Sequence, residues 1–281
     1  MGTLIPAIAC WLLIGAPPGA DSRLNALFLG DKGHHVPAER AEQLMPVLQQ
    51  RGIDVTYTED VASALKPETL AKYDALIVYA NIDAISPEGA KALLDYVANG
   101  GGFVPLHCAT YCFRNSDEVV ALMGGQFLRH GTGEFDTKVV DADHPIMAGL
   151  VPFKTWDETY VHTKHNPKDR VVLQVRPDPA GDEPWTWVRT HGKGRVFYTA
   201  YGHDNRTFGH PGFHDLVERG IRWAANKGKV YDSRPKAVAG LKPFEYEPPK
   251  GKIPSTSPAT VGARRARATT GCRSPSNRPS R

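Results

Sequence analysis

The sequence predicts an α/β fold with a doubly wound, mostly parallel sheet and extra antiparallel strands in the second half of the chain. Two observations support this prediction. Up to about residue 106, short apolar runs alternate with stretches of helical periodicity and are joined by short links. After Gly131, strand patterns follow one another with few helical stretches between them. Of the 281 residues, 41% are hydrophobic, so one large domain has enough apolar side chains for a core.

Four strand–helix units are predicted in the first half. The predicted strands cover residues 24–29, 53–57, 75–79 and 103–106. Most of them are runs of consecutive apolar residues, which are typical of parallel strands covered by helices on both faces. The predicted helices cover residues 38–50, a short stretch near 66–72, and a segment that Ser86 caps and Pro87 begins.

The second half is predicted to add strands and one closing helix. The predicted strands cover residues 134–140, 154–161, 170–175, 185–189 and 195–200, of which the last has the pattern of a buried strand. Residues 212–226 have apolar residues at helical spacing, so they predict an amphipathic helix that ends the domain. Trp156, Trp185 and Trp187 could stack on a sugar ring or pack in the core.

Residues 1–20 are predicted to be a signal peptide. An apolar run over residues 4–16 is followed by Pro17, Pro18, Gly19 and Ala20, and it is too short to span a bilayer. No Lys or Arg precedes the run, and a buried first strand is the alternative interpretation. We therefore expect export to the periplasm or the extracellular space, with no stable membrane anchor after the signal is removed.

The domain is predicted over residues 22–230, followed by a disordered basic tail over 231–281. Residues 251–281 contain seven Lys or Arg and no acid, so the rest of the chain carries +4 − 7 = −3. A segment this poor in apolar residues cannot offset the entropy cost of ordering. Because the basic charge belongs to the tail, the sequence does not favour nucleic-acid binding.

Imidazoles follow three of the predicted parallel strands. His34 and His35 come after the first strand, His107 after the fourth, and His203 after the last core strand. Ligands of doubly wound sheets bind beyond the carboxyl ends of the strands, so we expect these side chains to share a pocket. Taken singly, each is equally consistent with a loop or buried structural histidine. Neutral imidazole can act as a base, a metal ligand or a hydrogen-bond partner for sugar hydroxyls, and all three roles stay open.

Sequence motifs do not identify a cofactor. The H-E-x-x-H, P-loop, G-x-S-x-G and G-x-G-x-x-G motifs are absent. Cys108 and Cys112 have no second Cys pair or H-x₃-H to complete a metal site, so we expect two ordinary thiols, with a disulfide as the alternative. His162, His165 and His191 are expected at the surface. A divalent metal held by His and Glu side chains remains an alternative, but no motif signals one.

Several sequence blocks resemble the ThuA-like (trehalose utilisation) family. The blocks are GGGFVPLHCA (100–109), LMGGQFLRH (122–130), DHPIMAGL (143–150), DETY (157–160), PWTWVR (184–189), GKGRVFYTA (192–200), Gly202-His203-Asp204 and GIRW (220–223). The resemblance covers about residues 24–226. It implies a class I glutamine amidotransferase-like, flavodoxin-like fold and a small-molecule carbohydrate ligand, trehalose-related or an oxidised sugar.

The superfamily resemblance also suggests a Cys–His dyad of Cys108 and His203. Glutamine amidotransferases place this Cys between two glycines, whereas Leu106 and Thr110 stand there in this chain. Asn205 occupies the position of the Glu that follows the superfamily's His two residues later. A Cys-dependent amidase is therefore the least favoured of three hypotheses.

The favoured hypothesis is an enzyme that uses His107 in acid–base chemistry with Glu158 as its acid partner. His203 would complete the catalytic group, and His34, His35, His130, Tyr160 and Asp204 would bind the substrate. The second hypothesis is a carbohydrate-binding or accessory module without turnover. The substrate and the oligomeric state are left open by the sequence.

Overall fold

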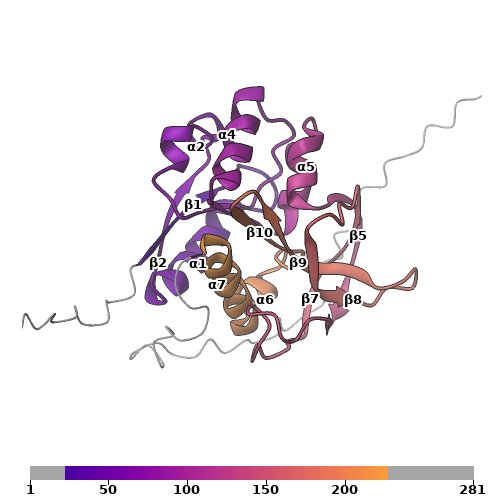
Figure 1. The fold of residues 1–281 in the computed structure, drawn as a ribbon. Coiled ribbons are helices and arrows are strands. Elements are labelled where there is room, and N and C mark those ends of the chain that lie inside the picture. Colours follow the sequence, from indigo (N-terminus) through magenta and orange to yellow (C-terminus); the bar gives the residue numbers. More distant parts are fainter. Residues whose placement is uncertain (1–22, 227–281) are drawn as a thin grey trace, which may run out of the picture. The chain divides into compact units, whose positions relative to one another are not determined.

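The computed structural model describes residues 23–226, which contain an eight-stranded mixed sheet (Figure 1). The strand order is β2-β1-β3-β4-β10-β9-β8-β6. The first five strands pair in parallel: β2 (Ile53–Thr58), β1 (Leu24–Leu29), β3 (Ala75–Val78), β4 (Gly102–Pro105) and β10 (Gly194–Thr199). The other three extend the sheet in antiparallel pairing: β9 (Glu183–His191), β8 (Arg170–Arg176) and β6 (Lys138–Val139). The predicted mixed α/β architecture is confirmed.

Helices cover both faces of the parallel strands (Figure 1). Ala26 and Phe28 of β1 pack in one core with residues of α1 (Pro37–Gln50) and α7 (Pro211–Ala225). Leu27 and Leu29 pack in a second core with residues of α2 (Val61–Ala64), α3 (Pro67–Leu70), α4 (Pro87–Ala98) and α5 (Asp117–Met123). Since successive strand residues point to opposite faces, one continuous apolar run fills both cores.

Local signals place the ends of several elements. The Ser86 side chain accepts a hydrogen bond from the Gly89 N–H, and Pro87 is the first residue of α4, as expected. Trp185 and Trp187, two residues apart on β9, are both fully buried in the core. Of the three tryptophans considered for sugar stacking, these two are therefore core residues.

A separate two-stranded antiparallel sheet is formed by β5 (Gln126–Phe135) and β7 (Thr155–Thr163). The predicted strand over residues 134–140 was wrong in its bounds, because β5 begins at Gln126 and β6 is a separate short strand. Many β5 side chains are exposed, so this strand lacks the apolar run by which the others were found. The short helices α5 and α6 (Asn205–Phe208) were also not predicted.

Strand order places the candidate site. The chain connects outward from β1 to β2 on one side and continues to β3 on the other, so β1 and β3 flank a topological switch point. Crevices at such points hold the ligands of doubly wound sheets. A short 3₁₀ helix, η1 (His107–Tyr111), follows β4 at the same edge, and β5 contacts η1 while α6 contacts β7.

The predicted signal peptide (1–20) and basic tail (231–281) lie outside the described residues. Within residues 23–226, no helix combines the length and the apolar character that a bilayer crossing requires.

Candidate functional site

Four side chains from distant parts of the chain converge beyond the carboxyl ends of the parallel strands. His35 lies in the loop after β1, His107 begins η1 two residues after β4, and His203 lies in the loop after β10. Glu158 comes from β7 of the second sheet. One nitrogen of each histidine and one oxygen of Glu158 all lie within 4.8 Å of one another. The predicted gathering of these imidazoles at one edge of the sheet is therefore what the structure contains.

Glu158 is at the centre of the group. Its Oε2 atom lies 3.2 Å from His107 Nε2, 3.3 Å from His203 Nδ1 and 3.9 Å from His35 Nε2. The other oxygen, Oε1, lies 3.5 Å from Nδ1 of His130 on β5. The carboxylate thus faces four imidazoles while its side chain is only 9% exposed. We call His35, His107, His203 and Glu158 the His₃Glu cluster.

His107 is held in an unusual backbone conformation. Its φ of +45° lies in the left-handed region, which non-glycine residues adopt rarely and at an energetic cost, so the surrounding packing must hold it there. Its Nδ1–H donates to the carbonyl of Ala200 (2.7 Å), and its ring stacks on Tyr160 with centroids 4.1 Å apart. Gly202, at φ +132°, passes so close that an added Cβ would lie 3.3 Å from the His107 Cβ. Packing on several sides therefore fixes the direction of the His107 Nε2 lone pair.

His35 is oriented by a chain of hydrogen bonds that begins at the end of β1. Its Nδ1–H donates to Asn81 Oδ1 (2.5 Å), and the Asn81 backbone N–H donates to Asp31 Oδ2 (2.5 Å). This chain joins the residues that follow β1 to the residues that follow β3. The Nε2 atom of His35, on the other side of the ring, is buried and has no hydrogen-bond partner.

His203 is placed by a buried carboxylate. Asp157, the neighbour of Glu158 on β7, accepts hydrogen bonds from the backbone N–H groups of Gly202 (2.8 Å), His203 (3.0 Å) and Asp204 (3.2 Å). Arg40 of α1 donates to the His203 carbonyl (2.8 Å). The loop after β10 is therefore tied to β7 and α1, while His203 Nδ1 itself has no hydrogen-bond partner.

Burial and neighbouring charges set the protonation of the cluster. Burial lowers the pKa of His35, and burial together with His107 lowers the pKa of His203 to about 3. For Glu158, burial alone would raise the pKa, but the adjoining His107 and His35 rings and the positive charge that His107 and His203 can carry outweigh it and lower the pKa below its ordinary value. Near pH 7 the cluster therefore contains neutral His35 and His203 beside an ionised Glu158.

The predicted substrate-binding residues divide into two groups. His34, His130 and Tyr160 border the cluster: His34 is exposed with its ring centroid 4.2 Å from that of His35, and Tyr160 is buried beneath His107. Asp204 is already occupied, because its carboxylate caps α6 and binds the Arg206 guanidinium (2.5 and 2.8 Å). Asp157, Asn81 and Arg40 support the site, and none of them was among the predicted catalytic or substrate-binding residues. Two signals were available: Asn81 stands just after the third predicted strand, and Asp157 is the D of the DETY block.

Cys108 does not have the environment of a thiolate nucleophile. It is fully buried, and burial raises the pKa of its thiol well above the ordinary value. The strained residue after β4 is His107 rather than Cys108. Cys108 and Cys112 are both free thiols, and Cys112 Sγ donates to the Ala80 carbonyl (2.9 Å). These observations argue against a Cys-dependent amidase.

His162 was expected at the surface and is instead buried. Its Nδ1 lies 2.8 Å from Glu183 Oε1, and its Nε2 lies 2.8 Å from the Tyr198 hydroxyl. That hydroxyl also lies 3.2 Å from the His107 carbonyl. The prediction was wrong because polar strand residues are normally expected to face solvent. In β7 several of them, including Asp157 and Glu158, are buried instead.

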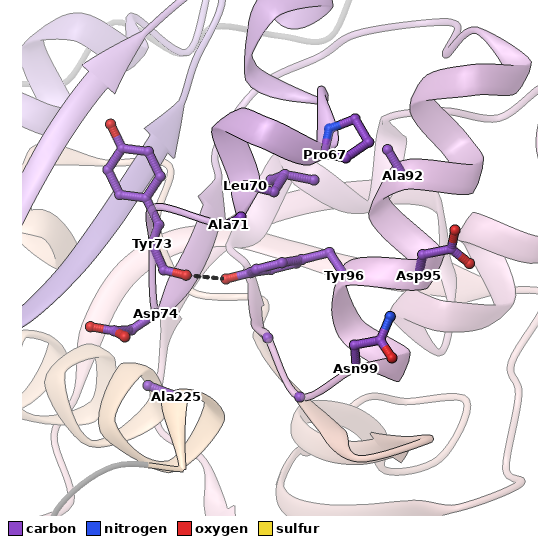
Figure 2. A pocket seen from close by; sticks show the side chains of 12 residues that line it. Pro67, Leu70, Ala71, Tyr73, Asp74, Ala92, Asp95, Tyr96, Asn99 and Ala225 are labelled. Carbon is purple, nitrogen blue, oxygen red and sulfur yellow. Dashed lines mark hydrogen bonds between the residues drawn. The ribbon is translucent and has the colours of Figure 1, made fainter.

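A hollow of about 550 Å³ lies at the opposite edge of the sheet (Figure 2). It is lined by Asp74 and Gly101, which precede β3 and β4, and by residues of α3 and α4. The Tyr96 hydroxyl donates across it to the Tyr73 carbonyl (3.1 Å). No imidazole lines this hollow, so the chemistry-bearing groups point to the His₃Glu cluster instead.

The sequence matches the family model ThuA, described as trehalose utilisation, over residues 25–224. Solved structures share the fold. A ThuA-like protein from Parabacteroides merdae is 23% identical with a TM-score of 0.65, over 76% of this chain and 94% of that one. A ThuA-like protein from Bacteroides uniformis is also 23% identical, with a TM-score of 0.61 over 74% and 94%.

More distant structures resemble the same fold. A β-galactosidase from Rahnella sp. R3 is 15% identical with a TM-score of 0.53, over 76% of this chain and 33% of that one. No match was found among curated proteins. At identities below 25%, these similarities show a shared fold only, and the chemistry of this chain depends on its own side chains.

Proposed function

Because this chain belongs to the ThuA (trehalose utilisation) family, we propose that it acts on a small-molecule carbohydrate at the His₃Glu cluster. The ligand would be trehalose-related or an oxidised sugar. The observation that carries the proposal is the convergence of three imidazoles on the Glu158 carboxylate at the switch-point edge of the sheet.

The cluster has the groups that sugar chemistry requires. Unpaired imidazole nitrogens of His35 and His203 can accept hydrogen bonds from sugar hydroxyls, and the ionised Glu158 can stabilise the positive charge of a protonated His107. His107 lies between Glu158 and the Ala200 carbonyl, so its ring can move a proton at Nε2 while Nδ1 keeps the ring in place. This arrangement supports acid–base turnover with His107 and Glu158 as the catalytic pair.

A ligand would reach the cluster most easily from the side of His203 and His130, whose rings are partly exposed. The side chains of His203 and His130 are 28% and 26% exposed, whereas that of His107 is fully buried. A sugar would approach over His130, His203 and His34, and its reacting carbon would face Glu158. Asp204 is not proposed as a sugar ligand because Arg206 already binds its carboxylate.

The test is a thermal-shift and product screen of the full chain against disaccharides, keto-sugars and polyols. A ligand that binds the native state raises its melting temperature. We expect a shift and product for wild type and for His191→Gln, which lies near the Gly194 end of β10, away from the cluster. For His107→Gln we expect turnover to fall about 10²-fold or more.

Two outcomes decide between the candidate functions. Binding without product after long incubation would replace the enzyme with a carbohydrate-binding module. Equal turnover in His107→Gln and wild type would overturn the assignment of His107. Iodoacetamide should leave activity unchanged, since Cys108 is fully buried.

We propose separately that the protein is exported after cleavage near Ala20. The apolar run over residues 4–16 and the small residues that follow it support this proposal. Mass spectrometry of the protein recovered from a periplasmic fraction should show a mature chain that begins near Asp21. Recovery of only the uncleaved chain in the cytosol would refute it.

A further inference from the structure

The hydrogen bonds around the His₃Glu cluster leave hydrogen-bond acceptors facing one another at its centre. A carbonyl oxygen can only accept, so His107 must hold its proton on Nδ1, where Ala200 accepts it. The Nε2 atom of a neutral His107 then faces Glu158 Oε2 at 3.2 Å with a lone pair. Two acceptors at this distance repel each other unless a positive charge lies between them.

The same conflict recurs at the other two histidines. His35 donates from Nδ1 to Asn81, so its Nε2 lone pair points toward the cluster, where it is buried without a partner. His203 Nδ1 is also buried without a partner and lies 3.3 Å from Glu158 Oε2. A single proton can satisfy one of these three contacts. One cation at the centre can satisfy all of them.

The spacing of the four donor atoms suits a transition-metal ion. Ligands about 2.1 Å from a tetrahedral ion lie about 3.4 Å from one another, and neighbouring ligands of an octahedral ion lie about 3.0 Å apart. The distances of 3.2 and 3.3 Å from Glu158 Oε2 to His107 Nε2 and His203 Nδ1 fall near these values, whereas His35 Nε2 lies further out at 3.9 Å. All four donor atoms lie within 4.8 Å of one another, so a small inward movement of the side chains would complete the sphere. The cluster is therefore close to the size of a coordination sphere before any ion binds.

The supporting bonds are those that metal sites use. Histidine ligands typically donate their second ring N–H to a carbonyl or carboxylate, which fixes the tautomer and the direction of the free nitrogen. His107 does so through Ala200 and His35 through the Asn81 side chain. Asp157 and Arg40 hold the loop that carries His203. Each of the three histidines thus has its own support from a different part of the fold.

We propose that His35 Nε2, His107 Nε2, His203 Nδ1 and the Glu158 carboxylate together bind one divalent first-row transition-metal ion, of the class that includes Zn²⁺ and Mn²⁺. Imidazole and carboxylate are the ligands these ions share. An ion that accepts five or six ligands would keep a position for an oxygen donor on the side of His130. If the proposed function holds, that donor is a hydroxyl or carbonyl oxygen of the sugar. With the ion bound, the three imidazole nitrogens and Glu158 would serve as ligands, so their acid–base and hydroxyl-binding roles apply to the metal-free cluster.

The experiment measures metal binding without any sugar. The full chain is treated with a chelator, dialysed, and titrated with Zn²⁺ and separately with Mn²⁺ by calorimetry, and bound metal is counted by elemental analysis. We expect one ion per chain in wild type and in His191→Gln. We expect at least a tenfold weaker affinity in His203→Gln, whose partly exposed side chain makes it the ligand least involved in folding.

Two further measurements keep the outcome clear. Co²⁺ should give a visible absorption band that is lost in Glu158→Gln, and circular dichroism checks that both variants remain folded. Less than 0.1 ion per chain in reconstituted wild type would overturn the proposal, as would equal affinity in wild type and His203→Gln. Metal binding without any sugar response would refute only the proposed function, and a sugar response without metal binding would refute only this inference.

Discussion

Two groups of buried or partly buried His and Glu side chains each contain a residue of β7, and they differ in how their polar atoms are satisfied. In the first, His162 bonds to Glu183 through one nitrogen and to Tyr198 through the other, both at 2.8 Å. In the second, the His₃Glu cluster, the nitrogens of His35 and His203 that point inward have no partner.

The difference separates a structural group from a site. Buried polar atoms are almost always hydrogen-bonded, and an unpaired one costs about 1–3 kcal/mol. The unpaired nitrogens of His35 and His203 carry this cost, and further hydrogen bonds hold both residues beside Glu158. At His162 there is no such cost, and its partner Tyr198 has its hydroxyl 3.2 Å from the His107 carbonyl. The His162 group is thus a support beneath the cluster.

Exchanging the Glu158 and Glu183 carboxylates for amides should give the largest difference in turnover between the two groups. Glu158→Gln removes the charge at the centre of the cluster, so we expect a loss of roughly 10²–10⁴-fold in turnover. Glu183→Gln keeps a hydrogen-bonding side chain beside His162, so we expect less than about a tenfold change in turnover. Steady-state kinetics on the carbohydrate found by the screen gives the comparison. Losses of similar size in the two variants would contradict the assignment of separate roles.

When one histidine of each group is replaced by leucine, the variant of the His162 group should lose more unfolding free energy than the variant of the cluster. His162→Leu leaves Glu183 and Tyr198 without their shared partner in the interior, so the unfolding free energy should fall by about 1–3 kcal/mol. His203→Leu removes a nitrogen that has no partner, so metal-free protein should stay within about 1 kcal/mol of wild type. Urea denaturation followed by circular dichroism measures both. A larger loss in His203→Leu would show that the cluster itself supports the fold.

The sequence predicted the parallel strands and the sheet edge that holds the cluster, because both follow from apolar patterns and strand order. Runs such as LNALFL (24–29) fill two cores at once, which identifies parallel strands and hence the edge where His35, His107 and His203 meet. The DETY block identified Glu158 through the family resemblance. The ring of supporting residues depends on contacts between segments 46 or more residues apart, such as His35 with Asn81 and Asp157 with His203, and no local pattern encodes them.

His162 shows why the remaining part was not predicted. The sequence TWDETYVHT of β7 contains polar residues that are expected to face water, yet Asp157, Glu158 and His162 are all buried. Their partners come from β9, β10 and the loop after β10. Burial of a polar strand is a tertiary property, because it depends on partners that the strand itself does not supply.

The pH dependence of stability should sharpen the comparison further. Burial lowers the pKa of His162 below 6.5, and this effect outweighs the Glu183 hydrogen bond, which raises it. The unfolded chain takes up a proton near pH 6.5 that the folded chain does not, so the stabilisation present above pH 6.5 is lost as the pH falls. Tyr198 and His165 also face this ring and are unchanged in the variant.

We therefore expect the unfolding free energy of metal-free wild type to fall between pH 7 and pH 5. His162→Leu should lose less over the same interval, by up to about 1.4 kcal/mol per pH unit. Urea denaturation at pH 7, 6 and 5 measures both slopes. An equal or steeper loss in the variant would mean that His162 is charged in the folded protein.

The smallest expected effects concern the two histidines at the border of the cluster. His130 Nδ1 lies 3.5 Å from Glu158 Oε1, so His130→Ala changes the surroundings of the central carboxylate and should weaken carbohydrate binding about three- to tenfold. The exposed His34 packs its ring against His35, one step further from the carboxylate, and His34→Ala should weaken binding about twofold. Calorimetric titration with the same sugar compares them. If His34→Ala gave the larger loss, the ligand would have to enter over the loop after β1 rather than along β5, because the border residue that matters more is the one the sugar contacts.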